Sequence, residues 1–139
     1  MLVHARRTEL GDRPIAELAV AGKELRPEST VGDARALLER HAVKALPVLR
    51  GSTYVGAVDG DALAGAAEDE PVGPLARGLL LVAWGRTRAA DALAELDERG
   101  GTRLVVLDDD LGAYVGIVCL RGDREWLCVD EARLREAAS

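Results

Sequence analysis

The chain has 139 residues, 48% of them hydrophobic and 30% charged, a composition that fits one compact globular fold and is too apolar for a disordered protein. Its formal net charge of −6 argues against nonspecific binding to nucleic acid or to an anionic membrane surface, because both need clustered Lys and Arg. The longest aliphatic run, Leu79 to Trp84, is too short to span a bilayer, and the N-terminus lacks a signal-peptide pattern, so we expect a cytoplasmic protein.

The first half of the chain predicts a turn, an extended segment, a helix and a hairpin. The turn is short and amphipathic, from Pro14 to Val20, and the extended segment runs from Glu24 to Arg26. Ser29 or Thr30 provides the N-cap of a helix whose apolar residues recur every three or four positions. The runs ALPVL and TYVGAV, joined by RGS, then predict a β-hairpin, and a further helix is expected from Asp61 to Glu68.

The second half predicts the same elements in the same order. Val72 to Arg77 predicts the turn, Leu79 to Ala83 the extended segment, and Thr87 the N-cap of a helix that the Gly-Gly pair at 100–101 ends. RLVVL and AYVGIVC, joined by DDDLG, predict the second hairpin. A C-terminal helix is expected from Asp130 to Ala138.

The two halves also match residue by residue. Asp33 aligns with Asp91 at an offset of 58 residues, and the match continues without a gap through the helix and the first strand. Two more residues in the second turn then place Tyr54-Val55-Gly56 on Tyr114-Val115-Gly116. An internal repeat explains this pattern. Neither copy alone has enough apolar surface to cover both faces of its sheet, so we expect the two sheets to pack together about a pseudo-twofold axis.

This ordered set of motifs, a hydroxyl cap, an apolar helix, L-P-V, a turn, V-G-hydrophobic-V, an acidic residue and a helix, resembles the cystathionine-β-synthase (CBS) repeat. Two copies in tandem are similar to a CBS pair, also called a Bateman module, and the resemblance extends from about Ile15 to Arg124. It implies an α/β fold of two β-α-β-β-α repeats, at residues 15–70 and 71–129. An N-terminal arm at 1–14 and a C-terminal helix at 130–139 complete the chain.

The resemblance also implies a function. CBS pairs are cytosolic regulatory modules that often form homodimers and often bind AMP, ADP, ATP or another adenosine-containing ligand between the repeats. In binding members, Thr or Ser at the end of the last strand and Asp three residues later hold the ribose and phosphate. Here the first position is Asp59 or Cys119, and the second is Ala62 or Gly122. Two functions therefore remain open: an adenine-nucleotide sensor, and a nucleotide-independent scaffold or dimerisation module that binds a partner protein.

Geometry borrowed from the family pairs the linker and sheet entry of one copy with the strand end of the other. The first predicted cleft contains Gly22, Lys23, Lys44, Ala45, Leu46, Cys119, Arg121 and Asp123. The second contains Leu80, Leu81, Thr102, Arg103, Leu104, Asp59 and Asp61. The cations among them, which could bind phosphate, are Lys23, Lys44, Arg103 and Arg121. Each of these four has an alternative interpretation as a solvated charge at a strand end.

Other motifs have simpler interpretations. The stretches DGD at 59–61 and DDD at 108–110 are interpreted as turn and cap residues, because an EF-hand loop would need further oxygen ligands. Cys119 and Cys128 have no metal-type spacing with either histidine and are interpreted as free thiols. No Ser-His-acid arrangement stands out, so we expect no catalysis and no required cofactor. Trp126, expected where a helix follows the last strand, could pack inside the chain or in a dimer contact.

Overall fold

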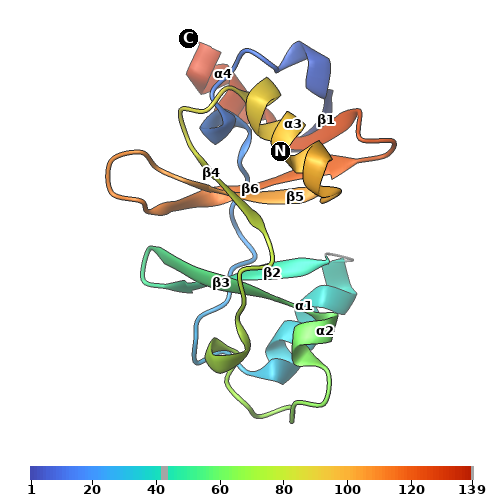
Figure 1. Ribbon diagram of the computed structural model, residues 1–139, viewed down its shortest axis with the longest axis vertical. Coiled ribbons are helices and arrows are strands. Elements are labelled where there is room, and N and C mark those ends of the chain that lie inside the picture. Colours follow the sequence, from blue (N-terminus) through green and yellow to red (C-terminus); the bar gives the residue numbers. More distant parts are fainter. Residues whose placement is uncertain (42–43, 139) are drawn as a thin grey trace. The chain divides into compact units, whose positions relative to one another are not determined.

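The computed structural model describes residues 1–41 and 44–138, and these residues fold into two units. Unit 1 combines residues 1–21 with the chain from Leu80 onward, and unit 2 contains Gly22–Leu79. Each unit has a β-sheet and helices of its own (Figure 1), so the predicted α/β class is confirmed.

Unit 2 is built on the antiparallel hairpin of β2 (Ala45–Arg50) and β3 (Thr53–Asp59). Leu25 adds a single parallel bridge to Val48 of this hairpin. The helical elements are α1 (Val31–His41), α2 (Gly60–Leu63) and the 3-10 turn η3 (Gly73–Leu75). Together these elements enclose one core, whose buried members are Leu25, Val31, Ala34, Leu46, Val48, Val58, Ala62, Leu63 and Val72.

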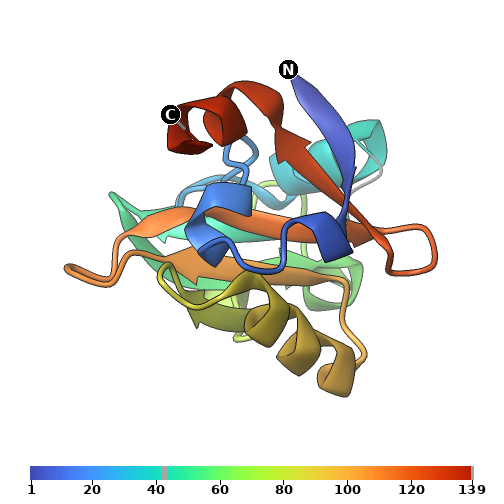
Figure 2. The ribbon, with the colours of Figure 1, turned by 90° about the horizontal axis from the view of Figure 1, so that it is seen from above.

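Unit 1 contains a five-stranded sheet in the order β1-β7-β6-β5-β4. Its strands are β1 (Leu2–Arg6), β4 (Leu81–Trp84), β5 (Arg103–Leu107), β6 (Tyr114–Arg121) and β7 (Trp126–Asp130). Its helical elements are η1 (Arg7–Glu9), η2 (Ile15–Leu18), α3 (Ala89–Arg99) and α4 (Glu131–Ala138). Figure 2 shows β1, in blue, beside β7, and α4 continuing from β7. The side chains of η2 and α3 pack with Leu134 of α4 on one core.

The two units do not divide the chain where the sequence repeats do. Residues 15–21, which lead the first repeat, belong to unit 1, and residues 72–79, which lead the second, belong to unit 2. Ile15 and Leu18 are accordingly buried in the core of unit 1, and Val72 is buried in the core of unit 2. Each repeat thus gives its leading segment to the unit built on the other repeat's hairpin. The repeat boundaries, 15–70 and 71–129, stay a prediction about the sequence.

The shared glycine of the Tyr-Val-Gly motif lies where these exchanged segments meet the sheets. In unit 1, Val20 and Ile117 exchange two backbone hydrogen bonds of 2.9 Å each. In unit 2, Arg77 and Ala57 exchange two of 2.9 and 2.8 Å. A Cβ at Gly116 would lie 2.9 Å from the carbonyl carbon and oxygen of Val20, closer than Cβ atoms approach. The motif is therefore repeated because a crossing backbone needs the space that glycine leaves.

The helix expected from Asp61 to Glu68 is wrong in length, because α2 ends at Leu63. The Arg35 guanidinium donates to the carbonyl oxygens of Leu63 at 3.0 Å and Ala66 at 3.1 Å, which gives these groups partners outside a helix. Gly65 then takes a left-handed φ of 79°. A side chain from α1 thus stabilises a turn where the local pattern predicted helix.

The second repeat departs from the expected order after its last strand. β6 runs on to Arg121, turns, and returns as β7, so that Trp126 lies in a strand and not in the expected helix. Leu127 and Val129 are buried, and the residues that alternate with them along β7 are more exposed, which is the pattern of a strand with one covered face. The expected C-terminal helix follows as α4, and Ser139 lies outside the described residues.

The predicted N-caps differ between the two long helices. Thr30 caps α1, since its Oγ1 accepts from the Asp33 amide at 3.1 Å. Thr87 does not cap α3, whose N-cap is Arg88 without a side-chain hydrogen bond. The Ala89 and Ala90 amides instead donate to the backbone carbonyls of Arg13 (2.8 Å) and Gly11 (2.9 Å). The predicted left-handed helix end at Gly100 is confirmed, with a φ of 71°.

Candidate functional site

In unit 2, the predicted ligand residues gather at the end of β3. Asp59, the last residue of β3, lies opposite Ala45 in the hairpin. Its Oδ1 accepts a hydrogen bond of 2.8 Å from the amide of Ala62, three residues later. The side chain of Ala62 is only 5% exposed and belongs to the core. The carboxylate therefore already binds a first-turn amide that an anionic ligand would need at this strand end.

The remaining predicted residues of unit 2 divide into core and surface. Leu46 is 1% exposed and packs in the core, so its side chain is not available to a ligand. Lys23, Lys44 and Asp61 are exposed. Gly22 has a φ of 137°, and its amide donates to both carboxylate oxygens of Glu24, at 2.9 and 3.1 Å. Lys44 precedes Ala45, the strand partner of Asp59, and is an exposed cation at this strand end that could meet a phosphate.

In unit 1, the corresponding strand end has a different architecture. Cys119 lies within β6, and the strand continues for two residues before the turn that contains Asp123. Position 122, three residues after Cys119, is a glycine with a φ of 64°. In place of a helix N-terminus with free amides, this end of β6 therefore carries a hairpin to β7.

The structure brings together two residues that the sequence placed in different clefts. Arg103 of β5 is the direct partner of Cys119 on β6. Burial raises the pKa of the Cys119 thiol, and the nearby Arg103 guanidinium opposes this only in part. The thiol is thus mainly protonated at neutral pH. Beside this pair, the Thr102 carbonyl accepts from the Leu120 amide at 2.8 Å, and Leu104 is fully buried in the core. Arg121 is exposed at the end of β6.

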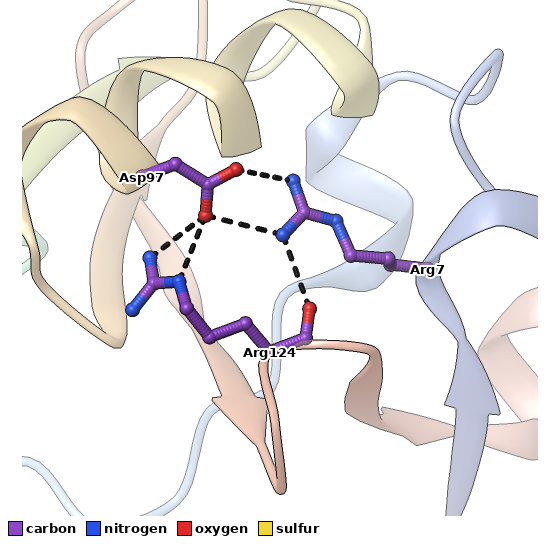
Figure 3. Close-up of polar contacts among 3 residues, drawn as sticks. All are labelled: Arg7, Asp97 and Arg124. Carbon is purple, nitrogen blue, oxygen red and sulfur yellow. Dashed lines mark hydrogen bonds and ion pairs between the residues drawn. The ribbon is translucent and has the colours of Figure 1, made fainter.

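A cluster that the sequence did not reveal joins three segments of unit 1 (Figure 3). The Arg7 guanidinium donates to both carboxylate oxygens of Asp97, at 3.2 and 2.9 Å, and Arg124 Nε donates to one of them at 2.9 Å. Arg7 also donates to the Arg124 carbonyl at 3.1 Å. The hydrogen bond from Arg7, supported by Arg124, lowers the pKa of Asp97. The cluster fastens η1 and the β6–β7 turn to α3, and we assign it a structural role.

Unit 2 also has an open surface hollow of about 560 Å³, lined by Pro27, Glu28, Arg50, Val55, Pro71, Gly73 and Pro74. None of the predicted ligand residues lines it. Among the described residues, no group of three His, Cys, Asp or Glu side chains is placed to hold a metal ion. Within that same part of the chain, no helix is long and apolar enough to cross a membrane.

Comparisons with known proteins identify relatives by structure and not by sequence. No family model matches the sequence. No curated protein matches it either. Solved structures do match. The CBS domain of a bacterial CNNM/CorC-family Mg²⁺ transporter in complex with ATP has a TM-score of 0.64 and 23% identity, over 81% of this chain and 84% of that one.

Two further structures agree. CBSX2 in complex with AMP has a TM-score of 0.63 and 25% identity, over 91% of this chain and 96% of that one. The CBS domains of a transcriptional regulator from Streptococcus pneumoniae have a TM-score of 0.63 and 18% identity, over 83% of this chain and 92% of that one. The chain therefore has the fold of a tandem CBS-domain pair, as the order of its motifs predicted.

Proposed function

We propose that this chain is a non-catalytic, cytoplasmic regulatory module that binds a partner protein and acts without the ribose–phosphate contact of nucleotide-binding CBS pairs. The observation that carries the proposal is the bond from the Ala62 amide to the Asp59 carboxylate, with the Ala62 side chain buried in the core. A phosphate approaching this strand end would meet a negative charge and one amide fewer.

The other strand end supports the same proposal. Beyond Cys119, β6 leads into the turn at Gly122 and Asp123 and then into β7. Neither unit thus presents the carboxylate three residues after the strand end that would hold a ribose. Because both departures remove the same contact, a function that needs this contact is disfavoured at both ends.

Exposed apolar side chains of unit 1 support a protein partner. Trp84 and Val82 of β4 are 52% and 40% exposed, and Leu111, in the β5–β6 turn, is 89% exposed. Large exposed apolar residues are enriched in protein–protein contacts.

We propose a homodimer as the basic assembly, which sedimentation or light scattering measures directly. A monomer at micromolar concentration would contradict it.

An adenine-nucleotide sensor is the second candidate. It is supported by the similarity to CBSX2, whose structure was solved with AMP, and by the cations Lys44, Arg103 and Arg121 at the strand ends. In such a sensor, the ligand would shift a conformational equilibrium by the difference in its affinity for the two states.

A thermal-shift titration with ATP, ADP, AMP, S-adenosylmethionine and NAD distinguishes the two candidates. Binding to the folded state raises Tm as the ligand concentration increases. At a ligand concentration of 100 times Kd, binding adds about 2.7 kcal/mol to the free energy of unfolding. We expect no concentration-dependent shift with any of the five ligands. A saturable shift that Lys44→Ala or Arg103→Ala abolishes would establish the sensor and overturn the proposal.

A further inference from the structure

One row of side chains crosses the sheet of unit 1 and contains both cysteines. His4 on β1 pairs with Cys128 on β7, and Arg103 on β5 pairs with Cys119 on β6. Between β6 and β7, the paired residues are Leu120 with Leu127 and Arg121 with Trp126. The paired residues end at Leu120 with Leu127, and extending the same register by one residue would set Cys119 opposite Cys128.

Both thiols lie on the same face of this sheet. The residues beside them in sequence, Val118, Leu120, Leu127 and Val129, all belong to the core of unit 1. Because successive side chains of a strand point to opposite faces, the two cysteines lie on the face away from that core. Both are free and partly exposed.

The spacing of such a pair suits a disulfide. Residues that face each other on antiparallel strands have Cα atoms about 4.5–5.5 Å apart, within the range of about 4.4–6.8 Å that a disulfide requires. A disulfide between neighbouring strands would then form without moving the backbone far. The charge on Cys128 also helps to raise the pKa of Cys119, as expected for neighbouring thiols.

We propose that Cys119 and Cys128 are a redox pair that forms an intrachain disulfide by exchange with a low-molecular-weight disulfide such as oxidised glutathione. The thiolate of one cysteine attacks a glutathione sulfur, forming a mixed disulfide and releasing one glutathione thiolate. The thiolate of the other cysteine attacks the protein sulfur of the mixed disulfide and releases the second. The chain thus loses two electrons and two protons, and oxidised glutathione becomes two molecules of reduced glutathione.

Cys119 lies two residues before the end of β6, so the bond would change this strand end. It would join β6 to β7 and close residues 119–128 into a loop that includes Arg121 and Asp123. It would also remove the thiol that faces Arg103. Oxidation is therefore a modification that reaches this strand end directly, whether or not a nucleotide binds there.

Equilibration of the full chain in glutathione buffers of increasing oxidised fraction tests the proposal. After each equilibration, free thiols are trapped with iodoacetamide, and the intact mass is measured. We expect the species with two alkyl groups to be replaced by a monomer with none and no bound glutathione, and peptide mapping to identify the 119–128 link. Retention of both alkyl groups, accumulation of glutathione adducts, or a disulfide between two chains would overturn the proposal.

Single substitutions provide the matched controls. Cys119→Ser and Cys128→Ser should each accumulate the mixed glutathione disulfide, because the second thiol is missing. A third variant, Cys128→Ser with Asp130→Cys, keeps two thiols on one face of the sheet but moves one by two residues along β7. It should retain glutathione adducts under conditions that fully oxidise the wild type. Equally complete crosslinking of this variant would show that the observed register does not select the pair.

Discussion

Gly116 and Gly56 set how closely a crossing segment can approach each sheet. At Gly116, the atoms that a methyl group would meet belong to the backbone of Val20, and that backbone is held by its two hydrogen bonds to Ile117. At Gly56, the φ of 146° and contacts of 3.1 Å to Arg77 impose the same restriction. Neither site can relax by a side-chain rotation alone.

Gly116→Ala should therefore lower the free energy of unfolding by about 2–3 kcal/mol, since either the bonds to Val20 lengthen or the strand shifts. Chemical denaturation measures this. Gly78→Ala is the control, because a Cβ there would meet nothing within 4 Å. Its effect should stay within about 0.5 kcal/mol. Equal losses in the two variants would show that the contact with Val20 costs nothing.

At the scale of single residues, the sequence revealed some features and concealed others. The repeated glycine could be recognised because both copies keep it, but the segment that requires it is distant in sequence. The Asp97 cluster gave no signal, since Arg7 lies 90 residues away and Arg124 lies in a turn of no special composition. A side chain's partners depend on the tertiary fold, which local patterns do not report.

The two long helices begin in physically different ways. α1 has a side-chain cap, in which Thr30 bonds to the Asp33 amide and Asp33 Oδ2 accepts from the Thr30 amide at 3.4 Å. α3 relies on backbone carbonyls of the segment before η2. Similar residues, Thr30 and Thr87, thus have different roles.

Thr30→Ala should consequently cost about 1 kcal/mol of stability, the usual contribution of a hydroxyl cap. Thr87→Ala should change stability by less than about 0.5 kcal/mol, because no side-chain bond caps α3. Urea denaturation of the two variants side by side gives both values. A loss at position 87 as large as that at position 30 would contradict the assignment.

At the scale of elements, both hairpins and both long helices could be predicted, because a local hydrophobic period or a turn sequence marks each of them. β7 could not. Its pattern covers only five residues, and one of its partners, β1, comes from the opposite end of the chain. The length of α2 was overestimated because the Arg35 guanidinium, from another helix, binds the carbonyl of its last residue, Leu63.

The division into units leads to a prediction for fragments of the chain. Residues 22–79 contain every buried member of one core, including Val72. Residues 15–70 lack Val72 and expose Ile15 and Leu18, whose partners lie in the other core. The two fragments are nearly equal in length, so chain length does not distinguish them.

We expect the 22–79 fragment to unfold cooperatively on heating and the 15–70 fragment, at low concentration, to lack such a transition. Circular dichroism at increasing temperature makes the comparison. A cooperative transition in 15–70 alone, measured on a verified monomer, would contradict the observed partition of the cores.

At the scale of the whole molecule, the repeat and the fold class could be predicted because two copies of one pattern reinforce each other. The details of the candidate site could not, because they depend on where a strand stops. The sequence indicated turn and cap residues at 59–61, and the bond from the Ala62 amide to Asp59 confirms the cap, but only the structure shows that Cys119 lies in a continuing strand.

The exchange of leading segments has a consequence for how such a chain could originate. A half-length ancestor with one repeat would have had no leading segment packed on its own sheet, and two copies would have completed each other by reciprocal exchange. Fusion of the two genes would make the association of the two repeats intramolecular, so that it no longer depends on the protein concentration. Tandem duplication would then preserve the contacts of an older dimer inside a single chain.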